Sequence, residues 1–175
     1  MLESNIKYKG RVEITSKNKK SVRVHNEGTY HLFNLVNRIF SKTMIELTDI
    51  SQALPAYIAL ISDGDEVTDE AIRTNPTYSV FSRKSILIKE LPIVSKEIIE
   101  NTIKYSALLT TTVIDGSAIR LADKGYALLL DSHCKNILAF ASVDITSIKL
   151  MQETQLGQSE IAWSMSFSNT VEENN

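Results

Sequence analysis

Residue types that are scarce in this sequence exclude several classes of small protein. The single cysteine, Cys134, allows no intrachain disulfide, so a disulfide-dependent secreted scaffold is excluded. Six glycines leave little material for a loop that cradles phosphate, and no P-loop, Gly-x-Gly-x-x-Gly or Gly-x-Ser-x-Gly motif occurs. We therefore expect no enzyme built on those motifs.

Long hydrophobic runs are also lacking. The longest, at residues 126–130, has the length of a strand, far short of the roughly 20 apolar residues that span a bilayer. The first residues have neither a basic region nor an apolar stretch, so they do not resemble a signal peptide. We expect a soluble protein without a membrane partner, made in a reducing cytoplasm.

Neither sign of charge is in large excess, since 19 Lys and Arg stand against 21 Asp and Glu, a net charge of −2. Nucleic-acid binders are usually basic, and the isoelectric point of about 5.9 predicts no nucleic-acid specificity. One basic cluster, Lys17, Lys19, Lys20 and Arg23, is interpreted as a solvated hairpin tip, with an anionic partner as the less favoured alternative. The acidic segment 63–70 lacks the ligand spacing of an EF-hand, so a solvated loop is favoured over a calcium site.

No combination of residues in the sequence has the spacing of a metal or catalytic site. His25, His31 and His133 form no zinc-binding motif. His133 and Cys134 are adjacent, and adjacent side chains on a strand point to opposite faces, which disfavours a nucleophilic pair. We expect no catalytic, cofactor-binding or metal-binding residues. Trp163 shares its parity with apolar residues, which favours a core position over a sugar-stacking one.

Periodicity in the first half predicts a hairpin followed by a helix. Residues 6–26 alternate polar and apolar side chains around a polar link, the pattern of a β-hairpin. Residues 29–40 place their apolar side chains on one helical face. A strand is predicted at 56–61, and 62–75 is interpreted as a long surface loop with at most a helical turn.

Strands dominate the predictions for the second half. One broken strand or a pair of strands is expected at 78–88, then an interruption at Pro92, and one long strand within 98–114. A hairpin is predicted from strands at 126–130 and 137–143. The alternation from Glu160 to Ser168 is free of errors, and its predicted partner is 145–150.

These elements predict a mainly β (α+β) fold. We expect one domain over residues 1–169, an antiparallel β-sandwich with an N-terminal hairpin and an amphipathic helix packed on the sheet. Residues 170–175 are predicted to form a flexible C-terminal tail.

Two short segments suggest a family. His25-Asn26-Glu27-Gly28-Thr29 joins the first hairpin to the helix, and Trp163-Ser164-Met165-Ser166-Phe167-Ser168-Asn169 ends the last strand. With the order of apolar segments between them, the chain resembles small structural proteins of tailed, short-tailed crAss-like bacteriophages, which build neck and tail rings or collars. The resemblance implies a virion location, assembly in the host cytoplasm, and no catalytic residues.

The expected function is therefore that of a non-enzymatic virion protein, a homo-oligomeric and ring-forming component that contacts other virion proteins. Subunits of closing rings make head-to-tail contacts, and opposite charges can set their register. The candidate interface residues are Lys17, Lys19, Lys20, Asp63, Asp65 and Glu66. The alternative is a monomeric β-sandwich binding module for carbohydrate or a host surface.

Overall fold

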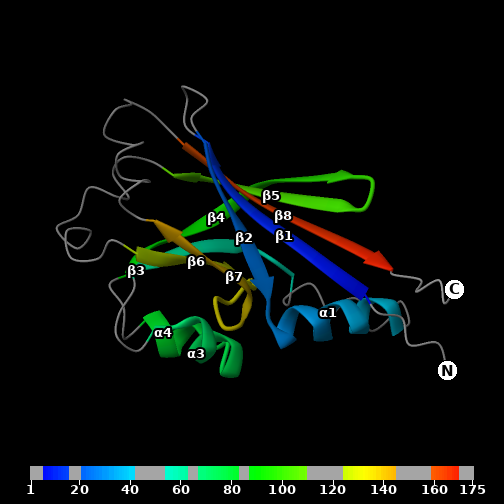
Figure 1. Ribbon diagram of the computed structural model, residues 1–175, viewed down its shortest axis with the longest axis horizontal. Coiled ribbons are helices and arrows are strands. Elements are labelled where there is room, and N and C mark those ends of the chain that lie inside the picture. The colour runs from blue at the N-terminus through cyan, green and yellow to red at the C-terminus, as the bar shows by residue number, and fades with distance from the viewer. Residues whose placement is uncertain are drawn as a thin grey trace, which may run out of the picture.

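The computed structural model describes residues 6–15, 21–41, 54–62, 67–82, 87–109, 124–144 and 159–169. These residues form eight strands and the helices α1, α3 and α4 (Figure 1). The elements in chain order are β1 (Ile6–Thr15), β2 (Ser21–Gly28), α1 (Tyr30–Ser41), β3 (Tyr57–Ser62), α3 (Asp69–Thr74), α4 (Tyr78–Ser82), β4 (Leu87–Ile99), β5 (Thr102–Leu109), β6 (Lys124–Leu130), β7 (Ile137–Asp144) and β8 (Ser159–Asn169).

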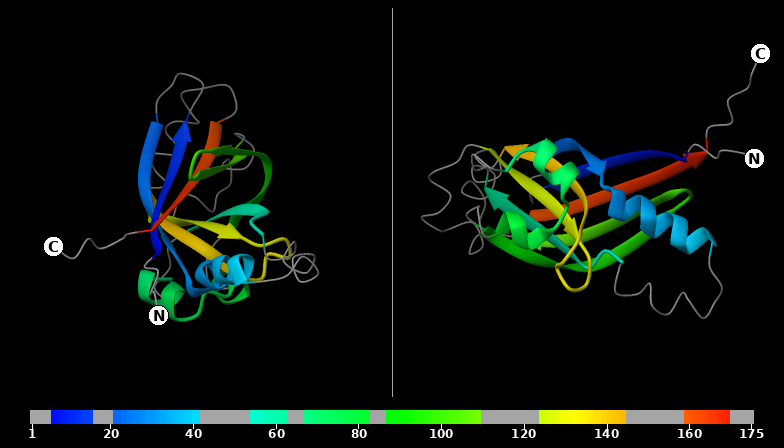
Figure 2. Two further views of the ribbon diagram at one scale, coloured as in Figure 1. Left: turned by 90° about the vertical axis from the view of Figure 1, so that its right-hand side faces the viewer. Right: turned by 90° about the horizontal axis from the view of Figure 1, so that it is seen from below.

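The strands close into an antiparallel barrel in the order β1-β2-β7-β6-β3-β4-β5-β8. Strand β8 completes it by pairing with β1 along its length, from Ile6 opposite Asn169 to Thr15 opposite Glu160. The fold is mostly β, but the expected β-sandwich is wrong, because no two sheets remain separate. Figure 2 shows the barrel from its end and from below.

Two strands turn the corners that close the barrel. Strand β2 pairs with β1 as far as Asn26, then with β7 through Glu27 and Gly28. Strand β4 pairs with β3 as far as Pro92, then with β5 from Ile93, with a register shift after Ile93. Bends and bulges are the usual means by which one strand passes between orthogonal sheets. The sequence prediction took Pro92 as an interruption, whereas it lies at a corner of a continuous strand.

The last strand shows the predicted alternation with different partners. Ile161, Trp163 and Met165 are buried inside the barrel, which confirms that Trp163 is a core residue. The predicted partner segment, 145–150, lies outside the described residues. Strand β8 instead lies between β1 and β5, two strands that are distant in the sequence.

The predicted hairpins and the first helix are confirmed. Strand β1 pairs with β2, and β6 with β7. Helix α1 buries Leu32, Leu35 and Val36 on one face. Its start is fixed to β7, since the Thr29 hydroxyl donates to the carbonyl oxygen of Ile137 at 2.6 Å. No helix among the described residues is long and apolar enough to cross a membrane.

Two short helices replace elements predicted as loop and strand. Helix α3 begins after Thr68, whose hydroxyl accepts from the backbone N–H of Ala71 at 3.1 Å. Its Ile72 is fully buried, so the described part of the expected surface loop is packed. Helix α4 buries Tyr78 and Phe81, one helical turn apart, where a strand was expected. The predicted tail, 170–175, lies outside the described residues.

The apolar side chains form two clusters that share strands β3, β6 and β7. One cluster fills the barrel, and the other lies between the outer face of these strands and helices α3 and α4. In β6, Ala127 and Leu129 belong to the inner cluster, and Leu128 and Leu130 to the outer one. The neighbouring β1, β8 and β5 have no such cover among the described helices, so their outer face is where a functional surface can lie (Figure 1).

Candidate functional site

The six residues proposed from the sequence as a subunit interface lie outside the described residues. Lys17, Lys19 and Lys20 fall between β1 and β2, and Asp63, Asp65 and Glu66 fall after β3. The structure therefore does not test the charge pairing between them, nor cation binding by most of that acidic segment.

The histidines and the cysteine do not come together in a site. His25 is exposed on the outer face of β2. His31 is half-buried on α1, and its pKa is lowered, with burial as the largest cause. His133 and Cys134 lie in the turn between β6 and β7. Burial, with Glu90 and Asp131, raises the pKa of the Cys134 thiol, which disfavours the reactive thiolate. Within the described ranges, no three His, Cys, Asp or Glu side chains could hold a metal ion.

An exposed apolar hairpin is the first candidate for a functional surface. Beyond the corner at Pro92, β4 pairs only with β5, and the two strands join through Glu100 and Asn101. We call residues 93–104 the hairpin arm. Val94, Ile98 and Ile99 are 57%, 63% and 58% exposed. Solvent contact over such a run of large apolar side chains is typical of a surface that another molecule covers.

The arm also carries an unpaired strand edge. Residues 93–99 bond to β5 on one side, and on the other side only Ile93 bonds to described chain, donating its N–H to the carbonyl oxygen of Ala56 at 2.9 Å. Free backbone groups on an apolar edge strand are a template for pairing with another chain. The arm therefore offers, at one place, apolar side chains and backbone groups that no described residue pairs.

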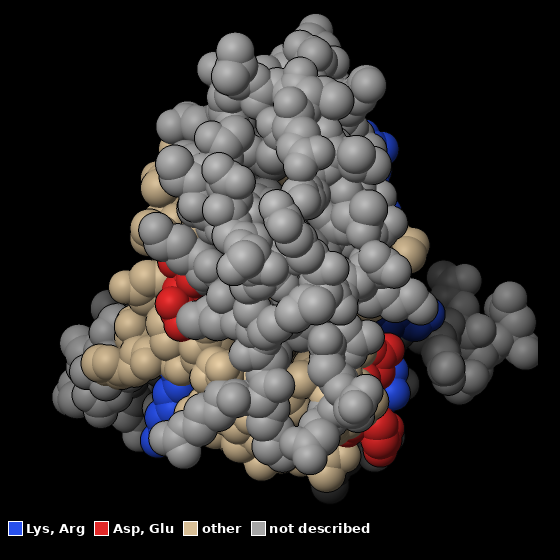
Figure 3. All heavy atoms as spheres, turned by 90° about the vertical axis from the view of Figure 1, so that its left-hand side faces the viewer, with Lys and Arg blue, Asp and Glu red and all other residues tan. Residues whose placement is uncertain are grey.

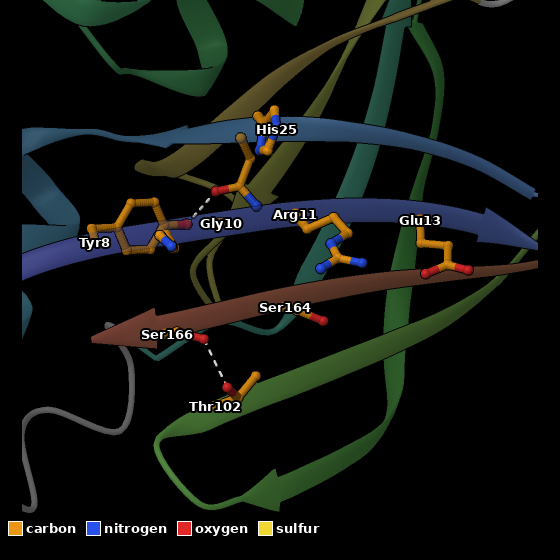
Figure 4. Close-up of a pocket in the computed structure, with 10 residues that line it drawn as sticks. Tyr8, Gly10, Arg11, Glu13, His25, Thr102, Ser164 and Ser166 are labelled. Carbon is orange, nitrogen blue, oxygen red and sulfur yellow. Dashed lines mark hydrogen bonds between the residues drawn. The ribbon is translucent and has the colours of Figure 1, made fainter. Parts of the chain in front are cut away.

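A basic trough on the outer face of the barrel is the second candidate. Its floor is β8, where small hydroxyl side chains face outward, and its walls are β1 and β5 (Figure 4). Arg11 lies beside Ser164, and Lys9 beside Ser166, with Thr102 on the far side of Ser166. The hollow has a volume of about 640 Å³. The two serines are shorter than the neighbouring Lys9 and Arg11 of β1, which leaves the depression over β8.

A buried polar cluster lies directly beneath the trough. The side chain of Asn26 fills the space over Gly10, where a Cβ atom would clash with the Asn26 amide. In the amide orientation that satisfies both of its groups, Asn26 donates to the Tyr8 hydroxyl and accepts from Trp163 Nε1 and the Arg11 N–H, both at 2.9 Å. Burial raises the pKa of Tyr8. These bonds hold β1 and β2 together at the corner and fix the backbone of Arg11.

The trough carries more positive than negative charge. Glu13, at one end, is paired with Arg23 at 3.3 Å. No ion pair to a described carboxylate is found for Lys9 or Arg11. Elsewhere the signs mix: at the end of the molecule shown in Figure 3, described acidic and basic side chains occur at both margins. Lys9 and Arg11 are thus without a described carboxylate partner, on a chain of net charge −2.

Sequence reasoning missed both surfaces for the same reason. It found the serines of β8 on the polar face, but not which strands flank them. It took Ile98 and Ile103 as parts of one region of strand, whereas they lie opposite each other across a hairpin. The available signal was Glu100-Asn101, a polar pair that interrupts the alternation between Ile98-Ile99 and Ile103.

The comparisons with known proteins add no assignment to this geometry. No family model matches the chain, and neither a curated protein nor a solved structure matches it. The likeness to bacteriophage neck and tail proteins stays a prediction, and so does the absence of enzymatic activity.

Proposed function

We propose that this protein is a non-enzymatic structural subunit that assembles with copies of itself through the hairpin arm. The observation that carries the proposal is the exposure of Val94, Ile98 and Ile99 on an edge strand. The resemblance to phage neck and tail proteins supplies the context, a virion assembly in which the oligomer also contacts other virion proteins.

The charges of the arm favour a second copy as the occupant of its edge. Two β4 strands related by a two-fold axis pair antiparallel, and residues opposite each other point to the same face of the joined sheet. Because side chains alternate along a strand, such residues are an even number of positions apart in the sequence. With Ile98 on the axis, Lys96 lies nearest to Glu100 of the partner subunit, the turn residue that directly follows β4, and the reverse pair forms symmetrically. Axes through Lys96 or Glu97 would instead place like charges together, which is destabilising. The register about Ile98 is thus one in which the charges of two arms attract each other.

The first test is the native mass over a range of protein concentration and salt, by size-exclusion chromatography with light scattering. We expect a discrete multiple of 19.6 kDa. Ile98→Lys should lower this mass to that of the monomer. Leu108→Lys is the matched control, because Leu108 is also exposed but lies outside the arm. A wild-type monomer at every concentration would overturn self-assembly and favour a monomeric binding module.

Charge reversal tests the register of the pair. Lys96→Glu and Glu100→Lys should each weaken assembly, because each places like charges opposite one another. The double variant should restore it, because the attraction is re-formed with its signs exchanged. Additive weakening in the double variant would reject the two-fold pairing about Ile98. Whether the arm mediates assembly in another register would then be decided by the Ile98→Lys variant.

A further inference from the structure

We infer that the basic trough over β8 is a binding site for a small ligand that bears a phosphate group. The inference goes beyond self-assembly, since the trough and the apolar edge of the arm use different side chains. Its basis is the placement of donors and cations around a hollow of about 640 Å³.

The donors converge across strands rather than along one strand. Register pairing sets Arg11 beside Ser164 and Lys9 beside Ser166. In Figure 4 the Arg11 side chain leans from β1 toward Ser164. Thr102 shares a hydrogen bond of 2.7 Å with the hydroxyl of Ser166, which links the β5 wall to the floor. An anion on this floor would meet a guanidinium, an ammonium and hydroxyl groups from three strands.

These groups match the needs of a phosphate ester. Its oxygens accept several charge-assisted hydrogen bonds, and the planar fork of arginine binds such oxygens in pairs. The nearby carboxylates are already engaged: Glu13 pairs with Arg23, and Glu160 with Lys104 and the hydroxyl of Ser106. Repulsion of an incoming anion is therefore reduced on this face.

Other ligand classes fit the trough less well. Single-stranded nucleic acids and neutral sugars are commonly held by stacking on aromatic rings. Tyr8 is the aromatic side chain among the lining residues, and it is turned inward, within the buried cluster beneath the floor. Charge and hydroxyl groups are what the surface offers, so the anionic group is the part of the ligand that is recognised.

The test is titration of the full chain with inorganic phosphate and pyrophosphate at low salt, followed by backbone amide NMR. We expect saturable shifts at Arg11, Ser164 and Ser166 below about 10 mM ligand. Arg11→Gln should weaken binding by about tenfold or more, because a charge-assisted hydrogen bond is lost. Lys9→Gln should weaken it less, because a lysine acts as a single point charge.

The matched control is Lys135→Gln, the same change at an exposed lysine in the turn between β6 and β7. It should leave binding unchanged. Absence of saturable shifts would overturn the inference, because the trough then binds no phosphate. An equal weakening by Lys135→Gln would also overturn it, because the protein then attracts anions through its overall charge. Melting temperatures of the variants show that the fold is intact, and the native mass, measured separately, tells failure here from failure of self-assembly.

Discussion

The β6–β7 and β4–β5 hairpins are both rich in apolar residues, but they differ in how far those residues are buried. Strand β6 is buried on both faces, with the barrel interior on one side and helices α3 and α4 on the other. In the β4–β5 hairpin, Tyr105 and Ala107 of β5 also lie in the inner cluster, but no described helix covers the outer face, and the arm exposes Val94, Ile98 and Ile99. Apolar content therefore shows where strands form, but not whether the protein covers them itself.

The largest expected difference between the hairpins is in the cost of shortening an apolar side chain. Leu129→Ala in β6 should lower the free energy of unfolding by about 2–5 kcal/mol, because Leu129 is fully buried and a cavity remains. Ile98→Ala in the arm should cost less than about 1 kcal/mol, because that side chain is already in water. Urea unfolding at a protein concentration below that of assembly gives both values. Equal losses would mean that the arm packs as a core element.

The turns of the two hairpins should differ next. The buried carboxylate of Asp131 accepts from the backbone N–H groups of Lys135 at 2.8 Å and Asn136 at 3.3 Å, and so shapes the β6–β7 turn. Asp131→Ala should cost about 1–3 kcal/mol, because two part-buried N–H groups lose their charged partner. Asn101→Ala, in the exposed turn of the arm, is the control and should be close to neutral. A neutral Asp131→Ala variant would show that backbone bonds alone hold that turn.

The parts of the fold that could be predicted are those specified by local pattern. The parity of Trp163 and Met165 on β8, the β1–β2 hairpin and the apolar face of α1 all follow from side-chain period. Barrel closure does not, because it depends on Asn26 and Pro92 lying at corners, and both residue types are also common where strands end. Helix α4 was missed because Tyr78-Ser79-Val80-Phe81 has β propensity, which its packing on the outer cluster overrides.

The two candidate surfaces were harder to predict than the fold. The trough combines Arg11, Ser164 and Thr102 from three strands that become neighbours only when the barrel closes. The arm is defined by missing neighbours, which no local pattern reveals. The lysines and acidic residues that the sequence did suggest were chosen because charges are dense there. Local charge density does not predict which strands become neighbours in the fold.

The cover over the β6–β7 hairpin should also give stability a dependence on alkaline pH. The Tyr78 hydroxyl donates to Glu90 at 2.7 Å, and burial followed by this bond raises the pKa of Tyr78. Since the unfolded tyrosine loses its proton first, stability is complete below about pH 10 and falls as the pH rises beyond it. Tyr78→Phe should make this fall smaller, measured by urea unfolding between neutral pH and pH values above about 10. An unchanged slope would assign the alkaline loss to Tyr8 and Tyr105, whose pKa values burial also raises.

The smallest expected effect has the opposite sign and comes from the arm. Glu100 has a φ of 53°, a left-handed conformation that costs a residue with a Cβ atom more than it costs glycine. Glu100→Gly should therefore raise the free energy of unfolding by up to about 1 kcal/mol. Glu100→Ala separates charge from strain, since it removes the carboxylate and keeps the Cβ atom. Cys134, with a φ of 51°, is the equivalent residue of the β6–β7 turn, but its side chain packs against the outer cluster. Cys134→Gly should therefore raise the free energy of unfolding by less than Glu100→Gly does. In the β6–β7 turn the relief of backbone strain is offset by the lost packing of the Cys134 side chain, whereas Glu100 is exposed and has no such packing to lose.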